Sequence, residues 1–175
     1  MEAVAMRTDG QAMVLCGDLK LPWNLQEWCD AAALRSWVEE ELASLDWENP
    51  EIVRHLQQRP GYEPRKLLGL LTYAYSTAVY ESEEIQHRCQ AEPESEYQAL
   101  AGPRWRPQAR ELSRFRRENR GLLKWALVQI SKRALRAHLA ELMLPAGLKR
   151  RLVDSVVARL DYARQMDQHQ EREDI

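Results

Sequence analysis

Glycine, cysteine and phenylalanine are scarce in this chain of 175 residues, which has 7 Gly, 3 Cys and 1 Phe. Few glycines beside abundant Leu, Ala, Glu, Arg and Gln favour helices. No apolar run approaches the ~18 residues that a membrane span needs. The first 20 residues have no basic segment ahead of an apolar stretch, so we expect no signal peptide and a cytoplasmic protein.

Metal-binding and redox motifs are also missing. The spacing of Cys16, Cys29 and Cys89 fits neither a CxxC pair nor a zinc finger or ribbon, and the four histidines are scattered. We therefore expect reduced cysteines, no metal and no cofactor.

Acidic and basic residues are segregated along the chain, although the net charge is only −2. Residues 1–100 contain 8 Lys and Arg against 18 Asp and Glu, whereas residues 101–175 contain 17 against 9. Such asymmetry indicates either an anionic partner for the basic part or pairing of the two parts inside the fold. Charge alone leaves both interpretations open.

Helical periodicity and capping residues predict an all-α, multi-helix globular domain. Residues 1–22 are expected to be an irregular arm, residues 23–164 a single helical domain, and residues 165–175 a polar tail. The expected helices span 24–45, 49–56, 64–78, 83–91, 107–119 and 122–144, and a last one begins near 146. Residues 91–106 are expected to form a loop with one helical turn near 97–100.

An arginine-rich face is expected on the helix over 107–119. Spacing of i, i+4, i+7 places Arg110, Arg114 and Arg117 together, with Arg116 to one side and an apolar strip opposite. Like charges at this spacing repel one another, and the guanidinium fork suits phosphate and guanine edges, so the face predicts nucleic-acid binding.

A second basic stripe, Lys132, Arg133 and Arg136, lies on the next helix. It either contacts a flanking run of phosphates or is the solvated side of a buried helix, and the second interpretation is favoured. Tyr97, Trp105 and Trp125 are either base-stacking platforms or core residues; because aromatics at helical spacing usually pack, we favour the core.

Three blocks of sequence resemble the N-terminal DNA-binding domain of bacterial insertion-sequence transposases. They are GYEPRKLLGLLTYAYS at 61–76, YESEEI at 80–85 with Cys89, and RP at 106–107 with Leu112, Phe115, Arg116 and Arg117. The resemblance covers residues 61–130 and implies a helix-turn-helix-like core that recognises transposon ends in duplex DNA. The carboxylates of Glu81, Glu83 and Glu84 depart from the family pattern and would repel phosphate.

The RNase H-like catalytic domain of those transposases has no counterpart among these residues, and Asp154 and Asp161 are expected to be salt-bridge partners rather than metal ligands. We therefore expect a non-catalytic DNA-binding protein of a mobile element that acts near the nucleoid. Its expected role is that of a regulator, or of a DNA-binding subunit beside a separate nuclease. A homo-oligomer is compatible with either role. The alternative is an adaptor whose acidic and basic halves dock proteins. The candidate DNA-binding residues are Arg106, Arg110, Arg114, Arg116, Arg117, Arg120, Lys124, Lys132, Arg133 and Arg136.

Overall fold

The computed structural model describes residues 21–49, 63–91, 94–139 and 146–173, and within these ranges the chain is helical and forms no strand. A 3-10 helix, η1 (Leu25–Glu27), is followed by α2 (Ala31–Ser44), α4 (Pro64–Ser76), α5 (Ser82–Ala91), α6 (Glu96–Ala101), α7 (Ala109–Glu118), α8 (Arg120–His138) and α9 (Ala146–Glu173). The prediction of an all-α, multi-helix domain is confirmed. α4, a turn at 77–81 and α5 follow one another as helix, turn and helix.

The central helix is α4, which packs against α2, α6, α7 and α8. Pro64 occupies its first turn, as predicted, because a missing N–H costs nothing there. Every residue from Leu67 to Ser76 is buried, including Gly69, Thr72 and Ser76. A helix covered on all sides needs no polar face. A Cβ on Gly69 would lie 2.8 Å from Leu42 Cδ1, so glycine allows α2 to approach closely.

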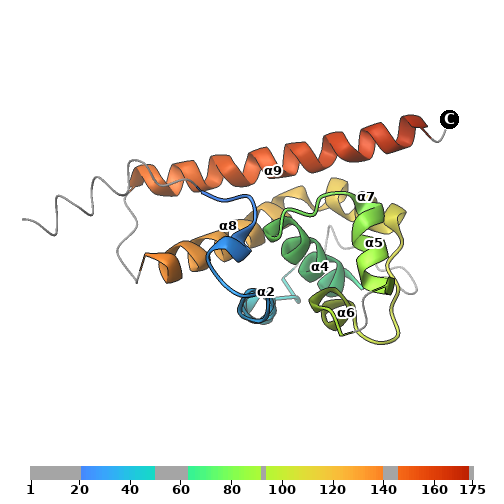
Figure 1. Ribbon diagram of the computed structural model, residues 1–175, viewed down its shortest axis with the longest axis horizontal. Helices are drawn as coiled ribbons and strands as arrows, with labels where there is room; N and C mark the ends of the chain where they lie inside the picture. Colours follow the sequence, from blue (N-terminus) through green and yellow to red (C-terminus); the bar gives the residue numbers. More distant parts are fainter. Residues whose placement is uncertain (1–20, 50–62, 92–93, 140–145, 174–175) are drawn as a thin grey trace, which may run out of the picture.

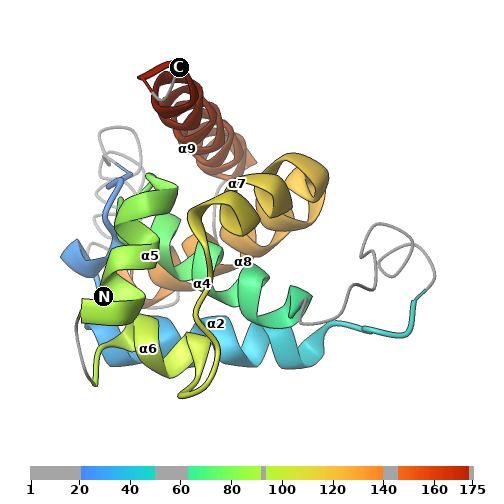
Figure 2. The same ribbon diagram turned by 90° about the vertical axis from the view of Figure 1, so that its right-hand side faces the viewer.

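The helices form layers with α9 on the outside. α9 packs on α8, α8 packs on α2 and α4, and α2 and α4 contact α6. Figure 1 shows α9 running along the top of the molecule, and Figure 2 shows α9 and α7 on the side opposite α2 and α6. A helix of 28 residues is about 42 Å long, so α9 spans the whole body.

The first predicted helix, over 24–45, is broken in the structure. Asn24 caps only the 3-10 turn, its side chain accepting a hydrogen bond from the Gln26 N–H at 3.0 Å. Asp30 then adopts an extended conformation and caps α2 by accepting from the Ala33 N–H at 2.7 Å. Two N-caps within seven residues therefore start two helices where the apolar spacing predicted one.

The C-terminal end differs most from expectation, because α9 continues to Glu173 where a polar tail was predicted over 165–175. Asp167 lies inside that segment and is buried. Asp167 lies on the same face of α9 as the buried residues Val156, Leu160 and Ala163. The buried face of the helix therefore extends as far as this carboxylate.

The remaining boundaries agree within two residues where the structure describes them, except that α8 ends at His138, six residues before the predicted end at 144. α6 supplies the helical turn predicted near 97–100, and α7 begins at Ala109, after Pro107. The predicted helix at 49–56, most of the N-terminal arm and the residues 140–144 lie outside the described residues. Cys29 and Cys89 are free thiols, and Cys16 is not described. No helix in the described ranges is long and apolar enough to span a membrane.

Candidate nucleic-acid interface

Local sequence explains how α7 presents its arginines. The Glu111 carboxylate accepts a hydrogen bond from the Gln108 N–H at 3.0 Å, which fixes the start of the helix. Leu112 and Phe115 are fully buried, and this anchors the opposite face. The side chains of Arg110, Arg114 and Arg117 are exposed on one face, as the spacing predicts.

Arg116 was predicted to contact DNA, and the structure contradicts this because its side chain is only 3 % exposed. It forms an ion pair with Asp167 of α9. One nitrogen, Nη1, also donates to the Tyr75 hydroxyl at 2.5 Å and to the Tyr80 carbonyl at 3.2 Å. Burial lowers the pKa of the Arg116 guanidinium, and the Tyr75 contact opposes that shift. Arg116 is thus a structural residue that joins α7 to α4, α5 and α9.

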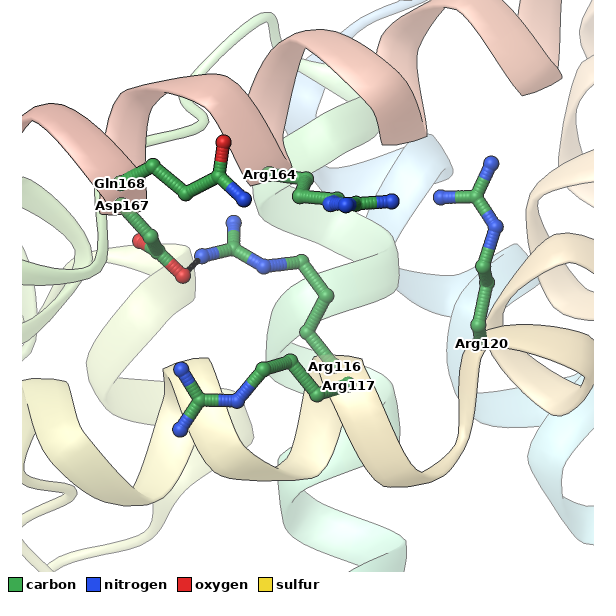
Figure 3. A pocket seen from close by; sticks show the side chains of 6 residues that line it. All are labelled: Arg116, Arg117, Arg120, Arg164, Asp167 and Gln168. Atoms are coloured by element: carbon green, nitrogen blue, oxygen red, sulfur yellow. Dashed lines mark ion pairs between the residues drawn. The ribbon is translucent and has the colours of Figure 1, made fainter.

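A pocket of about 400 Å³ lies between α7, the start of α8 and the C-terminal half of α9. Figure 3 shows it with α9 above and α7 below. Its lining consists of Arg116, Arg117, Arg120, Arg164, Asp167 and Gln168. Four guanidinium groups against one carboxylate make this the strongly cationic continuation of the α7 face.

The arginines of the pocket differ in how they are neutralised. Arg120 Nη2 pairs with Asp161 Oδ1 at 2.8 Å, and both side chains are about half exposed. This confirms Asp161 as a salt-bridge partner. Arg164 is exposed and has no hydrogen-bond or ion-pair partner among the described residues. Its charge, like those of Arg110 and Arg114, is therefore available to an anion.

The residues of the second basic stripe, on α8, differ in their contacts and in their exposure. Arg133 pairs with Glu40 at 2.5 Å and Glu41 at 3.4 Å, and its guanidinium lies 5.9 Å from the centre of the Trp37 ring. Here the acidic and basic parts pair inside the fold, and Arg133 is held by carboxylates of α2, which disfavours its predicted DNA contact. Lys124 and Lys132 are half-buried, and Arg136 is exposed at the far end of α8.

Arg106 is exposed, but its guanidinium is engaged with the backbone. Nη1 lies within hydrogen-bond distance of the carbonyl oxygens of Gly102, Pro103 and Trp105, at 3.5, 3.3 and 3.2 Å. These contacts hold the loop between α6 and α7. Arg106 therefore has a local role that its position in the sequence did not indicate.

The aromatic residues beside the arginines belong to the core, as favoured from their spacing. Tyr97 is buried, and its hydroxyl is 2.9 Å from that of Thr77. Trp105 and Trp125 are partly buried and pack against the core. Tyr97 therefore offers no ring face on which a base could stack.

A different aromatic cluster, partly exposed, includes Tyr162 of α9. Trp23, Tyr80 and Tyr162 meet edge to face, with ring centres 5.3 to 5.7 Å apart. Trp23 and Tyr162 are 42 % and 41 % exposed. The acidic helix α5 lies next to this cluster, and there Glu84 pairs with Arg88 at 2.7 Å.

Sequence reasoning missed Arg164, Asp167 and Gln168, which were placed in or next to a polar tail. A usable signal was present, because Leu160, Ala163 and Asp167 follow the i, i+3, i+7 spacing of a packed helix face. The described residues contain no group of His, Cys, Asp and Glu that could hold a metal ion.

Comparisons of the chain with protein-family models, with curated proteins and with solved structures found no match.

Proposed function

We propose that this protein binds duplex DNA through the exposed arginine face of α7, without catalysing a reaction on it. The observation that carries the proposal is the placement of Arg110, Arg114 and Arg117 on one exposed face of a helix whose other face is buried. The sequence resemblance to the DNA-binding domain of insertion-sequence transposases supports the same function. In this proposal the protein is a regulator, or the DNA-binding subunit beside a separate nuclease.

The charge balance around α7 supports a polyanionic ligand. Arg110 and Arg114 have no carboxylate partner within the described ranges. The nearby Glu111 is used to cap the helix instead. Like charges at i, i+4 destabilise a helix by a few tenths of a kcal/mol, and a bound phosphate backbone reverses that cost.

The test compares two double variants that each remove two positive charges. Arg110→Ala with Arg114→Ala alters the α7 face, and Lys149→Ala with Arg150→Ala alters two exposed residues at the start of α9. Binding to a fluorescent random-sequence duplex is measured by anisotropy from 50 to 200 mM salt. Each lost phosphate contact reduces the slope of log K against log salt by ~0.9, so we expect a decrease of ~1.8 for the α7 variant and a smaller one for the control.

Two results would refute the proposal. One is wild-type affinity that does not change with salt, because counterion release requires a steep dependence. The other is an equal effect of the two double variants, because binding would then follow net charge and not the α7 face.

A second candidate function is protein docking, favoured by the exposed pair Trp23 and Tyr162 beside the carboxylates of α5. Aromatic residues with a polar rim are typical of protein interfaces. Light scattering at low and high ionic strength, run beside the DNA measurements, separates the two functions. A large complex that forms without any binding of the duplex supports docking over DNA binding.

A further inference from the structure

The pocket between α7 and α9 brings together cations from two distant parts of the sequence. Arg117 and Arg120 come from the end of α7 and the start of α8, and Arg164 comes from α9. Figure 3 shows the guanidinium groups of Arg120 and Arg164 pointing toward one another across the pocket. Facing charges of the same sign repel, and an anion between the two guanidinium groups would remove this repulsion.

The carboxylates of the pocket do not supply that anion. Asp167 is buried in its ion pair with Arg116 and also accepts a hydrogen bond from Ser82 at 3.1 Å. Asp161 neutralises only Arg120, from a half-exposed position.

The lining also limits the chemical class of ligand. Arginine forks bind phosphoryl oxygens in pairs, and the side-chain amide of Gln168 is a further donor. Among the residues that the structure describes, no aliphatic or aromatic side chain lines the pocket, whereas sites for a nucleobase or another organic group have mostly such side chains. A ligand held here is therefore recognised by its phosphate and not by a base.

We propose that this pocket binds a phosphoryl group between Arg120 and Arg164, with Gln168 as an additional donor. If the phosphoryl group belongs to the backbone of DNA that lies along α7, this proposal rests on the proposed function. The same chemistry also accepts a free phosphate compound. The two sources are distinguished by separate arms of one experiment.

The experiment uses Arg164→Gln, with Arg150→Gln as a control that removes the same charge from an exposed position 14 residues earlier on α9. A third variant, Arg164→Lys, keeps the charge but loses the fork. In the first arm, pyrophosphate is titrated into each protein by calorimetry at constant ionic strength. In the second arm, binding of the random duplex is measured by anisotropy over the same salt range as above.

We expect wild type and Arg150→Gln to bind pyrophosphate, and Arg164→Gln to lose at least tenfold in affinity. For the duplex, Arg164→Gln should reduce the salt slope by ~0.9, whereas Arg164→Lys should keep the slope and bind more weakly. Pyrophosphate binding without any duplex binding supports the pocket, with a free phosphate compound as its ligand, and refutes the proposed function. Duplex binding with identical results for Arg164→Gln and Arg150→Gln in both arms supports the proposed function and overturns the pocket.

Discussion

The buried ion pair between Arg116 and Asp167 gives the sharpest stability prediction. We expect Asp167→Asn to lower the free energy of unfolding by ~3 kcal/mol. Removing one partner of a buried pair costs about 3–5 kcal/mol, because the other charge is left without compensation. The lower end applies here, since Arg116 keeps its hydrogen bonds to Tyr75 and Tyr80.

Urea denaturation and thermal unfolding measure this effect directly. For a chain of this length, ~3 kcal/mol corresponds to a decrease in Tm of roughly 6–12 °C. The matched control is Asp161→Asn, which removes a carboxylate from the same helix, where it pairs with Arg120 at a half-exposed site. Exposed pairs contribute about 0–1 kcal/mol, so the control should change little.

The comparison also has a clear negative result. If Asp167→Asn and Asp161→Asn differ by less than ~0.5 kcal/mol, the pair does not anchor α9 and the reasoning from burial is refuted. Hydrogen exchange locates the loss: protection should fall first in the C-terminal half of α9.

Two further predictions concern ionisation. Burial raises the pKa of the Cys89 thiol to about 12, so Cys89 should not react with a thiol reagent at pH 8 until the protein unfolds. The half-buried Cys29 should react slowly in the folded state. Fast labelling of Cys89 in the folded state would contradict this prediction. Burial likewise raises the pKa of Tyr75 and of Tyr80 from 10.0 to about 12. Because the fold favours the neutral hydroxyls, the free energy of unfolding should have its full value below pH 10 and fall as the pH rises toward 12. Urea midpoints that stay constant from pH 9 to 12 would exclude this linkage.

The sequence predicted best what local chemistry controls. Pro64 marks the start of α4, and the exposed face of α7 follows from the spacing of Arg110, Arg114 and Arg117. Such features depend on residues within one or two turns, so they can be derived from a single helix at a time.

The sequence did not predict what depends on distant contacts. A helical wheel of α7 places Arg116 beside the exposed arginines, yet Arg116 is buried, because Asp167 of α9 and Tyr75 of α4 lie against its guanidinium. Arg133 appears to be one of a basic stripe until the fold brings Glu40 and Glu41 of α2 next to it. Whether an arginine is a ligand for DNA or a partner inside the protein thus depends on residues that lie from 51 (Asp167 from Arg116) to 93 positions (Glu40 from Arg133) away in the sequence.

The pairing of residues 116 and 167 also has a consequence for synthesis on the ribosome. The body around α4 and α7 emerges first, so the Arg116 guanidinium has no neutralising carboxylate until Asp167 of α9 is translated. Leu148, Leu152 and Val156, which cover α8 in the finished fold, emerge before Asp167 as well. Domains generally fold as units as the chain elongates, so the nascent chain should stay protease-sensitive until α9 has left the exit tunnel, and then gain its resistance in a single late step.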